Sequence, residues 1–460
     1  MNVARYLCVL ASLGFSVRAQ SVSGLESTIE QRTGHHVKWR KDAATDALVA
    51  NAVHSLLRRT LTIDAAVQIA LLNNRDLQAT FEQIGIANAD LIEAGLLKNP
   101  VFDASPRFPD KPPGAADVEL SIAQDFLDII ILPLRKKVAR QDLDHARLQV
   151  GDAVLKLAAE TKSEYYHLQA EEALLAAIKA VDASSVAAVQ LAMRQHEAGN
   201  ISDLDLANQQ ATSSQSKLDV MAAELEIQSD REKLNRLMSL DGEDWKIPDE
   251  LPPLPAKEPA RRRLEALAIS QRLDLAATEA EWRSAVQALG ITRTYRYIGT
   301  VELGVDTENQ TDNQRITGPT LSLELPIFNH GQGRIARLEA QLREVERKIE
   351  SQAIGIRSEV REAANRADAE RTLTLYYRDE LCPERKRIID LTTTQYNSML
   401  KGGYDLVLAK QNELTAQRGY LEALRDYWIA RADLERATGG AASPTRISSS
   451  LTRDSRKTIH

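Results

Sequence analysis

Apolar residues along the 460-residue chain recur with two periods, and each period predicts its own kind of element. Spacings of three and four residues predict amphipathic helices, whereas strict alternation predicts strands with one apolar face. At about 1.5 Å per residue, the helix predicted over 134–198 would reach roughly 95 Å. The apolar seam that begins at Ile335 has the mean step of about 3.5 residues that is typical of coiled coils. This spacing predicts helices over 61–98, 134–198, 204–240, about 261–289 and 335–400. It predicts one more helix after the second tip, which runs back through Leu434.

Alternating apolar and polar residues occur at two places, and both predict a β-hairpin. The first hairpin pairs Val101–Phe108 with Val118–Phe126 across a proline-rich turn. The second pairs Thr300–Asp306 with Thr320–Leu325 across the polar loop Thr307–Gln314. Each strand has one apolar and one polar face, and each is long enough to cross an outer membrane when it is tilted.

The order helix, hairpin, long helix, tip and returning helix occurs twice, which predicts two internal structural repeats. The predicted segments are a signal peptide (1–19), an N-terminal segment (20–60), a first repeat (61–240, with its hairpin at about 100–126), a proline-rich linker (241–260), a second repeat (261–438, with its hairpin at about 297–328) and a disordered tail (439–460).

Both predicted tips place glycine and aspartate between two helical patterns. Laying Asp203 on Asp405 aligns the two stretches at an offset of 202 residues, and Gly199 and Gly402 match after a slip of one residue. We interpret this as a repeated helical hairpin tip. Taken singly, either copy fits an ordinary helix cap better, because glycine and aspartate are common cap residues.

The first twenty residues have the layout of a cleaved secretory signal, with Arg5, the apolar run Leu7–Phe15 and Ala19 in that order. The apolar run is far below the ~20 residues of a spanning helix. No other apolar run approaches that length, so insertion into a membrane must use strands. After cleavage Cys382 is the only thiol, which leaves no internal disulfide.

The composition predicts a folded chain without a nucleic-acid partner, because 43% of residues are apolar, 27% are charged and the net charge is -7. His35 and His36 are adjacent and would not face one site, so we interpret them as solvated side chains rather than metal ligands. No Gly-x-Ser-x-Gly, zinc-binding pair or phosphate loop occurs at a meaningful spacing. We therefore expect neither an enzyme nor a cofactor.

Four strands leave two open sheet edges, and in a bilayer the unpaired backbone groups of those edges would cost several kcal/mol each. The strands must therefore close with strands from other copies, as a dimer of eight or a trimer of twelve. Two soluble hairpins packed on helices are the alternative. Aromatic residues gather at the strands as at membrane interfaces, namely Phe102, Phe108, Phe126, Tyr295, Tyr297 and Phe328.

Several short segments, by their order and duplication, resemble the TolC-like outer-membrane efflux channel family over roughly 61–439. The segments are 89–96 with Asn99-Pro100, 124–128 with 133–135, 325–329 with Gly331, and the two tips. Two further stretches, Tyr396–Leu400 and Val37–Trp39, resemble the CzcC-like heavy-metal branch of this family.

The resemblance implies a mainly α fold with a small β part, in which a long antiparallel α-helical coiled-coil barrel continues a twelve-stranded β-barrel completed by a homotrimer. It also implies an outer-membrane location in a Gram-negative bacterium, with the helical domain in the periplasm. The partners would be a periplasmic adaptor (membrane fusion) protein and an inner-membrane transporter of the resistance-nodulation-division type. The chain would be a passive exit duct for heavy-metal cations or drugs. A periplasmic coiled-coil scaffold and the channel of a type I protein secretion system are the alternatives.

The resemblance further implies that the second tip narrows the channel. Asp405 matches the first acidic position of the family's tip, whereas Leu408 occupies the second. We expect three copies of Asp405 to form a cation-favouring constriction, because a ring of like charges attracts counter-ions. Tyr404 and the pair Gly402-Gly403 would let the helices splay, and the first repeat offers Gly199, Asp203 and Asp205 at the corresponding tip.

Overall fold

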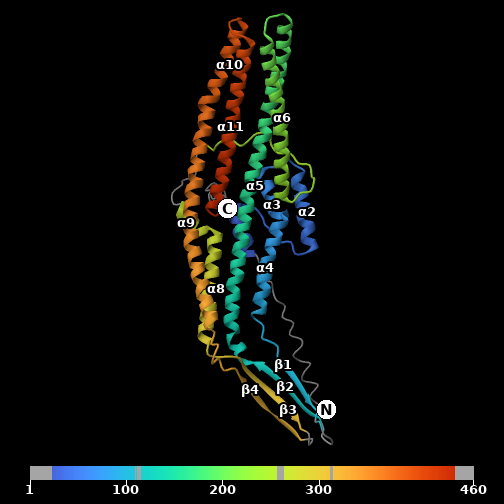
Figure 1. The fold of residues 1–460 in the computed structure, drawn as a ribbon, viewed down its shortest axis with the longest axis vertical. Helices are drawn as coiled ribbons and strands as arrows, with labels where there is room; N and C mark the ends of the chain where they lie inside the picture. Colours follow the sequence, from blue (N-terminus) through green and yellow to red (C-terminus); the bar gives the residue numbers. More distant parts are fainter. Residues whose placement is uncertain (1–22, 109, 111–115, 256–263, 311–313, 441–460) are drawn as a thin grey trace, which may run out of the picture.

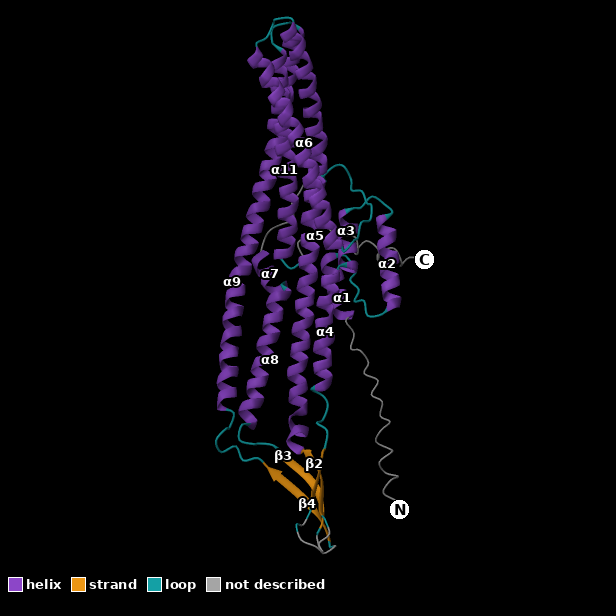
Figure 2. Ribbon diagram, turned by 45° about the vertical axis from the view of Figure 1, so that its right-hand side comes forward, coloured by secondary structure: helices purple, strands orange, loops and turns teal. Residues whose placement is uncertain are grey.

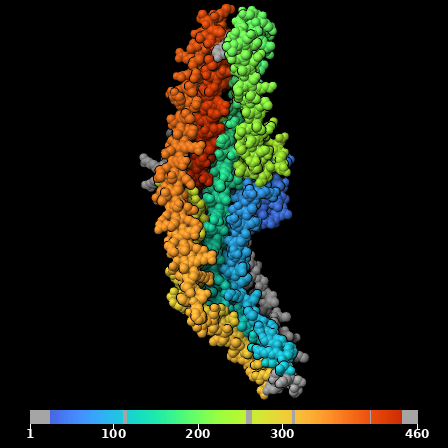
Figure 3. All heavy atoms as spheres, viewed as in Figure 1, coloured from blue at the N-terminus to red at the C-terminus, as the bar shows by residue number. Residues whose placement is uncertain are grey.

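The computed structural model describes residues 23–108, 110, 116–255, 264–310 and 314–440. The predicted signal peptide, most of the predicted tail and the end of the predicted linker lie outside the described residues. The described chain is a long rod of helices, with a sheet at one end and two helical turns at the other (Figure 1). Two helix pairs run side by side up to these turns (Figure 3).

Helices make up most of the described chain. The first half contains α1 (Ser23–Thr33), α2 (Ala43–Leu57), α3 (Ile63–Asn73), α4 (Arg75–Glu93), α5 (Phe126–Glu197) and α6 (Asp203–Met238). The second half contains α7 (Leu264–Gln271), α8 (Leu273–Tyr295), α9 (Gln332–Tyr376), the π-helical turn η2 (Tyr377–Leu381), α10 (Cys382–Asn397) and α11 (Gly403–Ala437).

The four strands form one antiparallel sheet in the order β1-β2-β3-β4, which projects beyond the helices (Figure 2). They are β1 (Val101–Arg107), β2 (Asp117–Asp125), β3 (Val301–Asn309) and β4 (Arg315–Leu323). The central pair, β2 and β3, joins the two halves of the chain. The mainly helical fold class with four strands per chain is confirmed.

The second hairpin is longer than predicted, and the predicted loop Thr307–Gln314 is wrong at its first end, because β3 continues to Asn309. β4 also begins at Arg315 rather than Thr320. The hydroxyl oxygens of Thr307 and Thr317 lie 2.8 Å apart across the pair, a contact that stabilises antiparallel strands. The alternation did not reveal this segment because it contains Gly318 and Pro319, which an edge strand tolerates.

The long helix α5 begins at Phe126 and not after Pro133, as the sequence suggested. Asp125 caps it, because its carboxylate accepts the N–H of Asp128 at 3.2 Å. Pro133 lies inside the helix, where it has no N–H to donate to the Ile129 carbonyl.

Among the described helices, α5 alone is long and apolar enough to cross a membrane by length and composition. This corrects the expectation that no segment after the leader reaches spanning length. α5 packs along α6, α8 and α11, as a member of the helical rod does.

The largest buried cluster lies near the middle of the rod, where α1, α3 and α4 pack on α5 and α2 packs on α3. The hydroxyl of Tyr165 donates to the Leu61 carbonyl at 2.8 Å, and Trp39 stacks on Phe81 with ring centroids 6.2 Å apart. His35, which the sequence suggested to be solvated, is buried here with Nε2 3.6 Å from the Asp64 carboxylate. The N-terminal segment is therefore part of the core.

Both repeats break their first helix where their last helix ends. In the first repeat, the Asn73 amide donates to the carbonyls of Met238 and Ser239, each at 2.9 Å. In the second, no asparagine stands at the break, and Arg32 from α1 donates to the carbonyls of Gln271 at 2.5 Å and Gly439 at 3.2 Å. Burial lowers the pKa of this guanidinium. The N-terminal segment thus completes the second repeat.

Candidate functional site

The first tip is a tight turn between α5 and α6 that its residues specify. Gly199 adopts a φ of +75°, and the N–H of Asn200 donates to the Gln195 carbonyl at 2.8 Å, which is the C-cap that favours glycine. Ser202 then caps α6, since its hydroxyl accepts the Asp205 N–H at 3.1 Å and the Asp205 carboxylate accepts the Ser202 N–H at 3.2 Å. These hydrogen bonds lower the pKa of Asp205 below its ordinary 3.8.

The second tip repeats this geometry with different residues. Met399 takes the left-handed position with a φ of +58°, which costs an L-residue roughly 1–2 kcal/mol. The N–H of Leu400 donates to the Gln395 carbonyl at 2.9 Å, and the N–H of Gly402 donates to the Asp405 carboxylate at 3.2 Å. The strained Met399 is 93% exposed, so packing within the chain does not explain its conformation.

Equivalent positions in the two tips differ by 200 residues, as the left-handed pair Gly199 and Met399 shows. The helix-capping carboxylates Asp205 and Asp405 differ by the same 200 residues. The alignment of Asp203 with Asp405 at an offset of 202 is therefore wrong. It was based on identical Leu and Gln residues after the turn, whereas the residues that form the turn itself match at an offset of 200. Asp203 is instead a 97% exposed side chain whose Oδ1 lies 2.6 Å from His196 Nε2.

In the single chain Asp405 serves as a helix cap. One of its carboxylate oxygens accepts the Gly402 N–H, and the other lies 3.6 Å from Lys401 Nζ. Gly403 and Tyr404 are the first residues of α11. The constriction that we predict at Asp405 depends on neighbouring copies of the chain, and it stays a prediction.

The sheet has one apolar face and one acidic face. Phe102, Ile122 and Val305 lie in register across β1, β2 and β3, and at least half of each side chain is exposed. On the opposite face Glu119 lies directly across from Glu308. The carboxylates of this face are Asp103, Asp117, Glu119, Asp125, Glu302, Asp306 and Glu308. Two of them are paired with cations, since Arg107 is 3.3 Å from Glu119 and Lys98 Nζ is 3.2 Å from Asp125.

The predicted interfacial aromatics are unevenly distributed along the sheet. Phe102, Phe126, Tyr295, Tyr297 and Phe328 lie towards the helical rod, whereas Phe108 follows β1 at the far end. The ring of Tyr297 stacks on His330 with centroids 5.8 Å apart, and Phe328 is 90% exposed. An aromatic band at one end of an apolar sheet is typical of a membrane–water boundary.

A buried ion pair fixes the junction between sheet and rod. The Asp128 carboxylate is fully buried and accepts from Arg135 Nη1 at 2.6 Å and from the Lys98 N–H at 3.2 Å. Arg135 also donates to the Leu96 carbonyl at 3.1 Å. These bonds tie the loop between α4 and β1 to the start of α5. Both charged residues lie in segments that resemble the efflux channel family, but the sequence did not predict that they form a pair.

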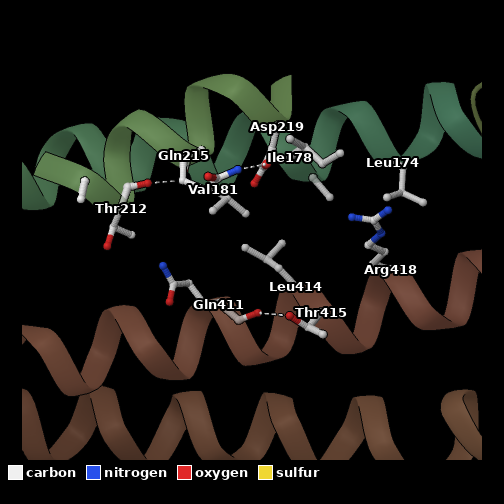
Figure 4. Close-up of a pocket in the computed structure, with 13 residues that line it drawn as sticks. Leu174, Ile178, Val181, Thr212, Gln215, Asp219, Gln411, Leu414, Thr415 and Arg418 are labelled. Carbon is white, nitrogen blue, oxygen red and sulfur yellow. Dashed lines mark hydrogen bonds between the residues drawn. The ribbon is translucent and has the colours of Figure 1, made fainter. Parts of the chain in front are cut away.

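A cavity of about 570 Å³ separates α11 from the α5–α6 pair in the tip half of the rod. Leu414 and Arg418 point from α11 towards α5, and Thr212 and Gln215 face them from α6 (Figure 4). No group of three or more metal-binding side chains occurs within the described residues. The chain thus offers a tip, a cavity, a junction and a two-faced sheet as candidate functional features.

Comparison with known proteins gives the class of this fold. The family model for outer membrane efflux proteins matches residues 110–240. The solved CmeC outer membrane channel of Campylobacter jejuni shares the fold with a TM-score of 0.71 at 17% identity, over 85% of this chain and 88% of that one. The open-state MtrE outer membrane channel of Neisseria gonorrhoeae does so with a TM-score of 0.67 at 18% identity, over 83% and 89%.

Residues 110–240 are thus similar to the outer membrane efflux proteins, and the fold of the chain is that of solved outer membrane channels. Within this class it is similar to the cobalt-zinc-cadmium resistance protein CzcC of Cupriavidus metallidurans. The two are 21% identical over 391 residues, which cover 82% of this chain and 90% of the relative. These similarities support the predicted family, role and outer-membrane location.

Proposed function

We propose that three copies of the chain close into one channel that conducts divalent heavy-metal cations out of the cell without chemical change. The observation that carries this proposal is the sheet, which has an exposed apolar face, an acidic face and two open edges. Exposed apolar strands are stable in lipid only when both edges are paired. Three copies give twelve strands, in keeping with the trimer that the family resemblance implies.

The helical rod supports the same closure. β1, α4 and α6 line one long edge of the chain, and β4, α9 and α10 line the other (Figure 1). On the first edge, Leu218 and Leu225 of α6 are 58% and 68% exposed, and on the second, Leu391 of α10 is 54% exposed. Apolar residues on two opposite edges fit a head-to-tail contact that repeats around a ring. On a monomeric periplasmic scaffold, the same exposed leucines would promote aggregation.

The acidic sheet face supports cations as cargo. If the apolar face meets lipid, the acidic face lines the interior, where carboxylates such as Asp306 and Glu308 outnumber the cations Arg107 and Lys98 that pair with this face. A pore lined by carboxylates favours cations over anions. The name of the CzcC relative points to cobalt, zinc and cadmium.

The remaining partners follow from the class of protein. We propose that a periplasmic adaptor and an inner-membrane transporter of the resistance-nodulation-division type contact the tip end, and that the chain itself has no enzymatic activity and no cofactor. The duct would carry whatever the transporter selects.

Two measurements test this proposal. In planar bilayers under a salt gradient, the purified full chain should give channels whose zero-current potential has the sign of cation selectivity. A deletion strain should become more sensitive to cobalt, zinc or cadmium. Anion selectivity together with unchanged metal tolerance would contradict the proposed cargo.

A further inference from the structure

The end of α8 and the start of α9 meet beside the sheet and form one corner of the rod (Figure 2). The guanidinium of Arg296 lies over the Tyr297 ring, 4.3 Å from its centroid, and the same ring stacks on His330 with centroids 5.8 Å apart. Arg293 Nη2 donates to a carboxylate oxygen of Glu339 at 2.6 Å, which joins the two helices. We call this corner, residues 293–297 and 328–339, the second junction.

Three cations of the second junction have no carboxylate partner within the described chain. Arg296, Arg334 and Arg337 are exposed, and no described carboxylate forms an ion pair with any of them. The first turn of α9 contains no acidic residue. Glu324, in the loop that follows β4, accepts instead the N–H and the hydroxyl of Thr300, at 3.2 and 3.0 Å. Positive charge is therefore in excess at this corner, where it can bind an anion from outside the chain.

Exposed apolar residues lead from the sheet to these cations. Leu325, Ile327 and Phe328 follow β4 and are 65%, 71% and 90% exposed. At ~1.5 Å per residue, Arg337 lies within about 10 Å of the start of α9. Apolar side chains, an aromatic band and then cations thus follow one another, in the order of the hydrocarbon core, the interface and the headgroups of a membrane.

We propose that Arg296, Arg334 and Arg337 bind the phosphate groups of anionic phospholipids in the membrane leaflet nearest the helical rod. A guanidinium matches a phosphate group with two parallel hydrogen bonds, and the Tyr297 ring orients Arg296 for this contact. Together with the aromatic band, the three arginines would fix the height at which the rod leaves the membrane. The inference rests on the channel proposed above, because it requires that the apolar sheet face meets lipid.

The lipid dependence of trimer stability tests this site. The purified full chain is heated in detergent with added phosphatidylglycerol or with phosphatidylcholine of the same acyl chains, and the midpoint of trimer dissociation is measured. The native trimer should gain more from phosphatidylglycerol, because only that headgroup is a net anion. The triple variant Arg296→Gln, Arg334→Gln, Arg337→Gln should lose most of this difference between the two lipids.

The matched control removes the same charge from the rod. Arg357, Arg366 and Arg387 are exposed on α9 and α10, about 30 Å or more beyond Arg337 by helix rise. Their replacement by glutamine should leave the difference between the two lipids unchanged. A smaller difference in this control would mean that net charge, and not the second junction, sets the preference.

Two further measurements apply even where the glutamine variant assembles poorly. Replacing the three arginines of the second junction by lysine keeps their charge and should keep the preference for phosphatidylglycerol. Raising the salt from about 0.1 M to about 1 M shortens the Debye length from about 10 Å to about 3 Å, and should weaken the preference in the native chain. A lysine variant as indifferent to lipid as the glutamine variant, or a preference that salt does not change, would contradict recognition by charge.

The remaining outcomes separate the lipid site from its rivals and from the channel itself. A glutamine variant that is destabilised equally in both lipids would place the arginines against a neighbouring copy and overturn the lipid site. An equal gain of the native trimer from inorganic phosphate, or from both lipids, would overturn it as well. A native chain that forms neither trimers nor channels would contradict the proposed function instead.

Discussion

At the scale of single residues, Asp205 makes the first tip dependent on pH. Its pKa is lowered in the folded chain by hydrogen bonds from Ser202, so the ionised carboxylate stabilises the tip above the ordinary value of 3.8. That stabilisation is lost as the pH falls through the lowered pKa. Hydrogen exchange at the start of α6 should therefore lose protection at acid pH. Asp205→Asn should remove most of this pH dependence, and an unchanged profile would contradict the role of the cap.

At the second tip, we predict that Asp405 affects the ion selectivity of the channel. If three copies form a ring, Asp405→Ala should move the zero-current potential towards zero and weaken block by divalent cations. Asp203→Ala is the control, since Asp203 is exposed and is not the counterpart of Asp405. Unchanged selectivity in Asp405→Ala would leave this residue as a helix cap alone.

At the scale of elements, the pair Asp128 and Arg135 holds the sheet to the rod. Removing one partner of a buried pair costs about 3 to 5 kcal/mol, because the other charge stays buried without its partner. Asp128→Ala should therefore lower the temperature at which the trimer dissociates far more than Asp103→Ala, whose carboxylate lies on an exposed part of β1. Asp128→Asn should fall between them, since an amide can still accept the Lys98 N–H. Equal midpoints for all three would show that the junction is held by other contacts.

The elements also show what the sequence could and could not predict. Apolar periodicity predicted the long helices and both hairpins, because the helix and strand periods are distinct over many residues. It did not predict the π turn at Tyr377, since one extra residue in a ladder leaves the seam on either side intact. It did not predict the cap at Met399 either, because a left-handed non-glycine residue has no sequence signal. The pairing of Asp128 with Arg135 could not be predicted, because the sequence suggested that α5 begins after Pro133, and Asp128 was therefore not placed on the same helix as Arg135.

At the scale of the whole molecule, closure into a ring depends on apolar residues that one chain leaves exposed. Leu218→Glu on α6 places a charge on the proposed contact edge and should shift the detergent-solubilised protein from trimer towards monomer. Val186→Glu is the matched control, because Val186 is exposed on α5, which lies between the two edges. The molar mass of each variant in detergent gives its trimer fraction. Equal trimer fractions for both variants would contradict the assignment of the edges.

The central claim is that copies of this chain together form a cation-favouring channel across the outer membrane. Reconstitution of the purified full chain in a planar bilayer under a salt gradient tests it most directly. We predict discrete channels from the trimeric fraction, with a zero-current potential of the sign expected for cations. A trimer that gives no channels, or channels that favour anions, would contradict the account.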